Sequence, residues 1–104
     1  MVSVRSTTMS AYLISEIDWH DSAKAKEYRE KFGPALEKHG GRTLCAGPPQ
    51  VLEGNWNPPR LVVLEFPSMQ ALHTWYDSEE HAPVRKLRLE GASSKVVAVE
   101  GPSG

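Results

Sequence analysis

The stretch Val51–Asp77, VLEGNWNPPRLVVLEFPSMQALHTWYD, decides the fold. Its centre, Leu61–Phe66, is a short run of mostly aliphatic residues between turn-forming segments, which predicts a strand buried on both faces. A Pro-Pro pair just before this run is stiff and extended. Ser68, just after it, is a residue type that caps the start of a helix. The stretch therefore predicts a central strand followed at once by a helix.

The other elements are predicted on either side of this stretch. Residues 11–18 alternate with a period of two and have apolar side chains on both faces, so they predict a strand covered on both sides. Residues 22–39 carry an apolar stripe at three- and four-residue spacing, which predicts a helix. The Gly33-Pro34 pair predicts a kink or break there, with a new helical piece starting at Pro34. The remaining predictions are a strand at 42–46, a short further strand at 50–53, a helix at 79–89 and a strand at 94–100.

This order of elements predicts an α+β fold of the ferredoxin-like kind. Two strand-helix-strand halves form a split β-α-β arrangement, with a four-stranded antiparallel sheet and the helices on one face. A chain of 104 residues has room for one core, so we expect a single domain over residues 10–101. Residues 1–9 are expected to be a disordered leader or a cloning remnant, and residues 102–104 a flexible tail.

The sheet face away from the helices is predicted to be too apolar to remain in water. Its expected side chains are Tyr12, Ile14, Leu61, Val63, Val96 and Ala98. Packing two such sheets against each other removes this exposure, and a twofold axis is the default symmetry of a pair. We therefore expect a face-to-face homodimer whose two sheets close into a dimeric α/β barrel.

Composition excludes several classes of partner. Lys and Arg total 12 against 13 for Asp and Glu, so the formal net charge of −1 offers no basic surface for nucleic acid. No apolar run approaches the roughly 18 residues that span a bilayer. The single cysteine, Cys45, excludes an internal disulfide and is typical of a reducing compartment. We expect a cytoplasmic protein with neither a nucleic-acid nor a membrane partner.

Several motifs together resemble the domain of unknown function family 1330. They are EGNW at 53–56, PPRLVVLEFPS at 58–68 and WYDSEEH at 75–81, and the opening AYLISEID and closing VVAVEG are similar too. The resemblance covers about residues 10–101 and implies a dimeric α/β barrel, in agreement with the dimer expected from the apolar face. Similar sequences have Tyr-Gln where this chain has His81-Ala82. The family has no assigned function, so the resemblance leaves the chemistry open.

Glu65 and Glu16 are the first candidates for catalysis. Both are expected to project from the helix-free face into the cavity of the dimer. There, burial and mutual repulsion would raise the pKa of a carboxyl group toward the range of a general acid or base. The alternative is that each is solvated at a strand end or is paired with Arg42 or Arg60.

His81 is the third catalytic candidate, because a histidine titrates near neutral pH. It would lie at the mouth of the same cavity. The alternative is an exposed helix residue without a role. Five aromatic and basic residues are expected to bind the substrate: Tyr12, Arg42, Trp56, Arg60 and Trp75.

The two tryptophans of that set, Trp56 and Trp75, could instead be ordinary core or interface residues. No metal site is expected, since no two histidines stand at i, i+4 and Cys45 has no partner motif. No cofactor is expected either, because the chain lacks a Gly-rich phosphate loop, a nucleophile elbow and a nucleotide fingerprint.

Three functions remain open from the sequence. The first is a cofactor-independent enzyme that binds a small apolar or aromatic metabolite and moves a proton, as in isomerisation, cyclisation or oxygenation. The second is a non-catalytic ligand-binding or accessory protein. The third is a structural dimer whose cavity is filled by side chains. The sequence predicts the fold and the dimer and does not select among these functions.

Overall fold

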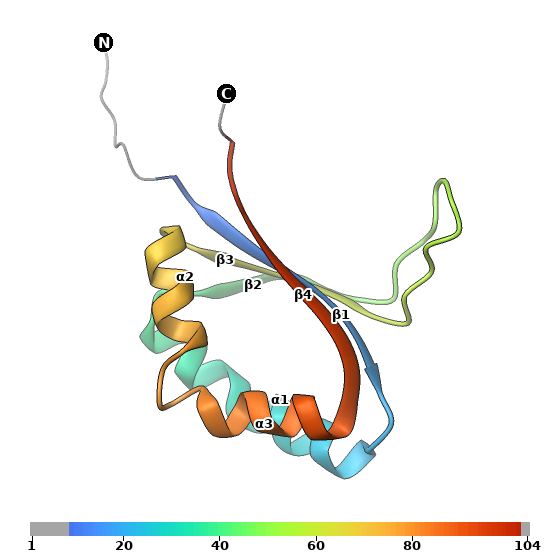
Figure 1. The fold of residues 1–104 in the computed structure, drawn as a ribbon, viewed down its shortest axis with the longest axis horizontal. Helices are drawn as coiled ribbons and strands as arrows, with labels where there is room; N and C mark the ends of the chain where they lie inside the picture. The colour runs from blue at the N-terminus through green and yellow to red at the C-terminus, as the bar shows by residue number, and fades with distance from the viewer. Residues whose placement is uncertain (1–8, 103–104) are drawn as a thin grey trace.

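The computed structural model describes residues 9–102 and shows one antiparallel sheet with helices packed on one of its faces (Figure 1). Three helices and four strands are present in this part of the chain. In chain order they are β1 (Ala11–Trp19), α1 (Ser22–Lys38), β2 (Arg42–Gly47), β3 (Leu61–Phe66), α2 (Met69–Tyr76), α3 (Ala82–Gly91) and β4 (Ala92–Glu100).

The strand order is β2-β3-β1-β4, and every neighbouring pair is antiparallel. The first strand therefore lies in the middle of the sheet, where Ala11 pairs with Phe66 on one side and with Glu100 on the other. This is the split β-α-β topology of the ferredoxin-like fold. The predicted α+β fold of the ferredoxin-like kind is confirmed.

The hydrophobic core lies between the sheet and the helices. The inward side chains of β1 and β3 alternate with outward ones, as the period of two requires. The large side chains of the core are Leu13, Leu36, Leu64, Phe66, Leu72 and Trp75, each at most 5% exposed. Burial of an aromatic or aliphatic side chain of this size stabilises the fold by about 1.5–3 kcal/mol.

The helix ends are set by local hydrogen bonds. Asp21 Oδ1 accepts a hydrogen bond from the Lys24 amide at 3.1 Å and starts α1. Ser68 Oγ accepts one from the Ala71 amide at 3.0 Å and starts α2, as predicted from the sequence. Gly40 follows α1 with a φ of 79°, a left-handed conformation that glycine adopts without a steric penalty.

Two predictions about the elements are wrong. α1 is one continuous helix from Ser22 to Lys38 with Pro34 inside it, so the predicted break and second helical piece are wrong, and the alternative of a kink stays a prediction. The preceding residue is Gly33, which has no Cβ to clash with the proline ring, so the helix passes the proline without a break. Residues 50–53 form no strand and belong to the long connection between β2 and β3.

The assignment of faces on the last strand is also corrected. Val97 pairs with Ile14 and Val99 pairs with Tyr12, so these two valines share the helix-free face. Val96 packs against the core on the opposite face, and Ala98 pairs with the inward-facing Leu13. The helix-free face remains apolar, but its β4 residues are the two odd-numbered valines, which are 60% and 48% exposed.

The connection between β2 and β3 projects away from the rest of the fold (Figure 1). It carries Leu52, which is 91% exposed, and Trp56, which is 58% exposed. The leader expected at residues 1–9 and the tail expected at 102–104 lie mostly outside the described residues.

Candidate functional site

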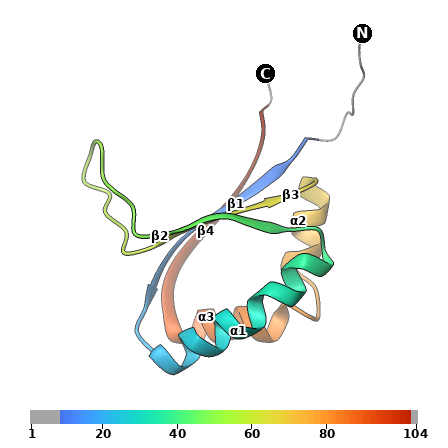
Figure 2. The ribbon, with the colours of Figure 1, turned by 180° about the vertical axis from the view of Figure 1, so that it is seen from behind.

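The helices leave one strip of the inner sheet face uncovered. α1 packs mainly against α3, and the side chains of β2 remain largely exposed. Figure 2 views the molecule from the β2 edge, with α1 running below the sheet. A cleft of about 200 Å³ lies between α1 and this strip of the sheet.

The cleft has an aromatic wall and an aliphatic wall. Trp19, Tyr28 and Phe32 form a row in which neighbouring ring centroids are 5.2 Å apart. The aliphatic side chains come from the sheet: Ile17, Ala46 and Val62. The polar groups in the lining belong to Arg29, Thr43 and Arg60 besides the tyrosine. A surface of this composition suits a small apolar or aromatic molecule.

A buried arginine lies beside the tyrosine of this wall. Arg88 is 5% exposed, and its Nη1 donates a hydrogen bond to Ser94 Oγ at 2.6 Å. Burial raises the pKa of Tyr28, and the neighbouring Arg88 guanidinium partly offsets that rise. Within residues 9–102, no carboxylate lies at ion-pair distance from Arg88.

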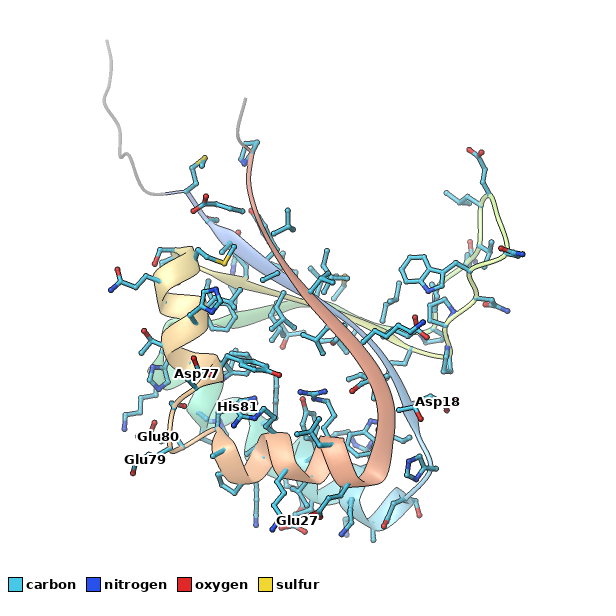
Figure 3. The ribbon with its side chains drawn as sticks, in the orientation of Figure 1. Asp18, Glu27, Asp77, Glu79, Glu80 and His81 are labelled. Atoms are coloured by element: carbon cyan, nitrogen blue, oxygen red, sulfur yellow. The ribbon has the colours of Figure 1, made fainter. Side chains whose placement is uncertain are left out.

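His81 lies in the same interior, next to α2. Its side chain is 1% exposed, and its ring lies 4.0 Å from the Trp75 ring, centroid to centroid. The interpretation of His81 as an exposed residue is therefore wrong. The mouth of a cavity on the helix-free face is also the wrong place for it, because it packs on the helix side. Figure 3 shows it turned inward, whereas Glu79 and Glu80 of the same turn point outward.

The environment of His81 disfavours its charged form. Burial lowers its pKa to about 4, and the positive charges of Arg85 and Arg88 contribute to the shift. Its Nδ1 is buried without a hydrogen-bond partner, and so is Nε1 of Trp75. The imidazole is therefore neutral near pH 7 and has an unused polar atom. Such a group can accept a proton only if a ligand or a motion of the chain reaches it.

The turn before α3 positions this histidine. Ser78 Oγ donates a hydrogen bond to the Trp75 carbonyl at 2.8 Å and accepts one from the His81 amide at 3.1 Å. The sequence predicts a helix that starts at residue 79. Ser78 caps a turn instead, and α3 starts at Ala82.

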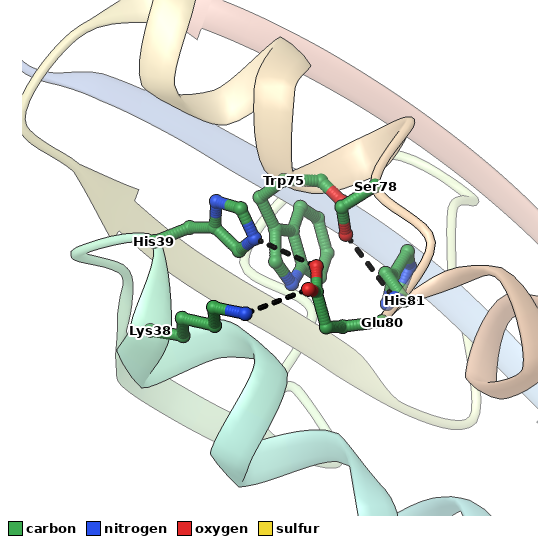
Figure 4. Close-up of polar contacts among 6 residues, drawn as sticks. All are labelled: Lys38, His39, Trp75, Ser78, Glu80 and His81. Carbon is green, nitrogen blue, oxygen red and sulfur yellow. Dashed lines mark hydrogen bonds and ion pairs between the residues drawn. The ribbon is translucent and has the colours of Figure 1, made fainter.

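An ion-pair cluster joins this turn to the end of α1 (Figure 4). Glu80 accepts a hydrogen bond from Lys38 Nζ at 2.7 Å and contacts His39 Nε2 at 3.3 Å. Lys38 and then His39 lower the pKa of Glu80 to about 2. Because its pKa is low, the Glu80 carboxylate is a weak base and is poorly suited to proton transfer. The cluster instead links the turn before α3 to the end of α1.

The helix-free face carries a separate polar group near one end of the sheet. Arg42 Nε donates a hydrogen bond to Glu65 Oε1 at 2.7 Å, and Arg42 Nη2 lies at the same distance from that oxygen. The hydrogen bond from Arg42 lowers the pKa of Glu65. Burial opposes this with a smaller effect, and Tyr12 contributes a still smaller lowering of the pKa. In the isolated subunit the alternative pairing with Arg42 is observed, and the rise predicted for the cavity of the dimer stays a prediction.

Glu16 lies on the same face, next to a shallow hollow of about 300 Å³ beneath Trp56. Its Oε1 accepts a hydrogen bond from Trp56 Nε1 at 2.8 Å. Glu16 pairs with Leu61 across the sheet, whereas Glu65 pairs with Tyr12 four residues earlier on β1. Four residues of strand span about 13 Å, so the two glutamates do not form one carboxylate pair.

The predicted site residues therefore fall into three groups. Tyr12, Arg42 and Glu65 lie together, and Glu16 lies with Trp56, all on the helix-free face. Arg60 lines the cleft, whereas Trp75 and His81 are buried behind it. The sequence analysis missed Trp19, Tyr28 and Arg88. One signal could have indicated the arginine, since it shares the buried stripe of α3 with His81 and Val84 at i+7 and i+4 spacing.

Over the described part of the chain, no three His, Cys, Asp or Glu residues gather closely enough to hold a metal ion. No helix among residues 9–102 is long and apolar enough to cross a membrane.

The strand order and the one-sided helix layer define a ferredoxin-like α+β protein. Residues 10–102 match the domain of unknown function family DUF1330. The chain belongs to that family. No curated protein sequence matches the chain.

Solved structures share the fold at low sequence identity. The RPA0582 protein of unknown function from Rhodopseudomonas palustris is similar with a TM-score of 0.74 at 15% identity, over 92% of this chain and 85% of that one. SnoaB, a cofactor-independent oxygenase from Streptomyces nogalater, has a TM-score of 0.67 at 7% identity, over 93% and 97% of the two chains. A dimeric ferredoxin-like protein of unknown function from Thermobifida fusca has a TM-score of 0.65 at 12% identity, over 95% and 97%.

Proposed function

We propose that this protein is a homodimer in which each subunit binds a small apolar or aromatic metabolite. The observation that carries the proposal is the cleft between α1 and the sheet, with its wall of Trp19, Tyr28 and Phe32. Aromatic rings that border open space are available to stack against a ligand ring, whereas the rings of a filled core are not.

The dimer forms through the helix-free face of the sheet. Val97 and Val99 are 60% and 48% exposed there, beside the half-buried Ile14 and Val63. A contiguous apolar sheet face of this kind is typical of an interaction surface. The similar Thermobifida fusca structure is described as dimeric, which supports the same assembly here.

Catalysis without a cofactor is the more specific form of the proposal. SnoaB, which shares the fold, is a cofactor-independent oxygenase. In this proposal His81, neutral near pH 7, accepts a proton only from a molecule that reaches past Phe32, which lines the cleft and has its ring centroid 6.5 Å from that of His81. Glu16 and Glu65 serve as acid or base only if the second subunit covers them, because removal from water favours the neutral form of a carboxyl group.

A non-catalytic ligand-binding or accessory protein is the second candidate. The observation that favours it is the composition of the cleft, whose lining contains no carboxylate and no histidine. For either function we place the protein in the cytoplasm, where the exposed thiol of Cys45 would stay reduced.

The proposed dimer is tested by substituting aspartate for each of two apolar residues that have nearly the same exposure. Val97→Asp places a carboxylate in the proposed interface and should raise the dimer dissociation constant by about 100-fold or more, measured by analytical ultracentrifugation. Leu89, 62% exposed on α3, is the control, and Leu89→Asp should leave the dimer intact. A wild-type protein that is monomeric at micromolar concentration would refute the dimer.

Ligand binding is tested by filling the cleft. Ala46→Phe puts a ring into it, and Ala46→Ser keeps it open. Indole, a neutral aromatic probe, should bind the wild type and the serine variant in ligand-observed NMR, and the phenylalanine variant should lose this binding. Equal binding to all three proteins would mean that the cleft is not the site.

A further inference from the structure

The charged side chains that line the cleft are all positive. They belong to Arg29 of α1 and to Arg60, which directly precedes β3. No aspartate, glutamate or histidine is in the lining. Within residues 9–102, no carboxylate lies at ion-pair distance from either guanidinium. The cleft therefore has a local excess of positive charge, although the whole chain has a formal net charge of −1.

The two arginines reach the cleft from opposite walls. Arg29 follows Tyr28 on α1, so it borders the aromatic wall. The Arg60 carbonyl accepts a hydrogen bond from the Ile17 amide at 3.0 Å, which holds this residue beside β1. Because side chains alternate along a strand, Arg60 shares the helix side of the sheet with Val62. An anion in the cleft would therefore have one guanidinium on the helix side of it and one on the sheet side.

The surroundings of the two arginines make a bound anion favourable. Arg29 is exposed and Arg60 is half-buried. A single exposed arginine is common on protein surfaces and needs no ligand. Two arginines that border one cleft without an acid are a different case, because like charges on facing walls repel each other. A bound anion offsets this repulsion, whereas a neutral ligand does not.

We propose that the cleft binds a small aromatic carboxylate, with its ring against the aromatic wall and its carboxylate between Arg29 and Arg60. The inference rests on the proposed function, because it specifies the ligand of the same cleft. A carboxylate has two oxygens, so each guanidinium can donate to one of them, and such charge-assisted hydrogen bonds are stronger than neutral ones. The cleft, at about 200 Å³, is smaller than the roughly 300 Å³ at the lower end for ligand pockets, so the ligand has a single ring.

The test compares two probes that share a ring and differ in charge. Benzoate and benzamide are titrated into the full-length wild-type protein, and binding is followed by isothermal titration calorimetry and by protein NMR shifts. The wild type should bind benzoate about ten-fold more tightly than benzamide at low salt, because charge-assisted hydrogen bonds replace neutral ones. Added salt should reduce this preference, since charges that are partly exposed are screened.

Variants of the two arginines then locate the charge. Arg29→Met and Arg60→Met should each reduce the preference for benzoate by about three-fold, and the double variant should bind both probes equally. Methionine keeps an apolar stem, so benzamide binding should change little. Lys26, exposed on α1 outside the lining, is the control. Lys26→Met removes the same charge from the chain and should keep the preference.

Thermal melts separate binding from a structural role. Arg29→Met should unfold at nearly the same temperature as the wild type, because an exposed residue without an ion pair contributes little to stability. If Arg60→Met fails to fold, Arg60→Lys keeps the charge and should retain part of the preference, because only the planar fork of donors is lost. Arginines with a purely structural role would give less stable variants with an unchanged preference, which would overturn the inference.

The remaining outcomes distinguish this inference from the proposed function. Equal binding of benzoate and benzamide by the wild type overturns the inference and leaves the proposed function standing. The same holds for a preference that survives in the double variant, or that Lys26→Met reduces as much as the arginine variants do. If the wild type binds none of indole, benzoate and benzamide, both proposals are wrong.

Discussion

The two faces of the sheet are built from the same strands but have different surroundings. On the helix side, Leu64 and Phe66 are at most 1% exposed, and the cleft and the unpaired buried polar atoms lie nearby. On the helix-free side, Val97 is 60% exposed, and Glu65 and Glu16 are already bound to Arg42 and Trp56. The difference indicates that the helix side stabilises the subunit and contains the buried polar atoms without hydrogen-bond partners. The helix-free side is available for the proposed dimer contact.

The largest expected effect is on the free energy of unfolding, when adjacent side chains of β3 that point to opposite faces of the sheet are truncated to alanine. Leu64→Ala should lower the free energy of unfolding of the subunit by about 2–5 kcal/mol, because it leaves a cavity in the core. Val63→Ala removes a half-buried side chain from the other face and should mainly weaken the dimer. Urea denaturation and ultracentrifugation of both variants measure the two effects. Equal loss of subunit stability in the two variants would contradict the contrast between the faces.

The next largest effect is a dependence of the free energy of unfolding on pH, caused by His81 on the helix side of the sheet. The pKa of His81 is lowered to about 4 from an ordinary value of 6.5, so the unfolded chain binds more protons than the folded chain between these two pH values. Its contribution to stability is therefore complete above pH 6.5 and is lost as the pH falls toward 4. We expect a loss of about 2 kcal/mol over this range.

Histidine variants check the source of that dependence by urea denaturation at several pH values. His81→Phe should remove this part of the slope. His73 is exposed on α2, and His73→Gln should keep it. A wild-type slope that is unaffected by His81→Phe would show that the histidine is not held neutral by its surroundings.

A smaller effect is expected where the projecting connection meets the helix-free face. Trp56→Phe removes the hydrogen bond to Glu16 and should loosen residues 48–60, at a free-energy cost of about 1 kcal/mol. Hydrogen exchange of the connection should then be faster, while exchange in β1 is unchanged. Leu52, 91% exposed in the same connection, is the control, and Leu52→Ala should have no effect.

The smallest effect is expected at the ion pair of the helix-free face. Glu65→Gln removes the charge that binds Arg42, whose side chain is 72% exposed, so subunit stability should change little. The pKa of Glu65 is lowered, so any contribution is present above its ordinary pKa and is lost as the pH falls below it. A thermal melt near pH 7 should show a small shift that disappears at high salt. A large, salt-independent shift would mean that this pair is buried by the second subunit.

The faces of β1 and β3 were predictable because one glutamate on each strand, Glu16 and Glu65, marks the side away from the core. Those of β4 were not, since Val96, Val97, Ala98 and Val99 are four small apolar residues in a row. In such a run, either the odd-numbered or the even-numbered residues could face the core, and a shift of one residue exchanges the two faces. Pairing with β1, where Val97 lies opposite Ile14, determines which β4 residues face the helices. The sequence pattern of β4 alone contains no information about this pairing.

The candidate site was less predictable than the fold. The spacing of His81, Val84 and Arg88 places them on one face of a helix. It does not show that Tyr28 of α1 and Ser94 of β4 meet that face. The burial of His81 was missed because two glutamates precede it in the sequence, whereas its position depends on the ring of Trp75 and on hydrogen bonds from Ser78.

The central position of β1 has a consequence for biosynthesis. Ala11 pairs with Glu100, so the middle of the sheet cannot be completed until nearly the whole domain has left the ribosome. Until then, one long edge of the first strand has no neighbour, and contacts between residues so far apart in sequence form slowly. The nascent chain should therefore depend on chaperones late in translation, and a ribosome stalled before residue 92 should hold an open, protease-sensitive polypeptide.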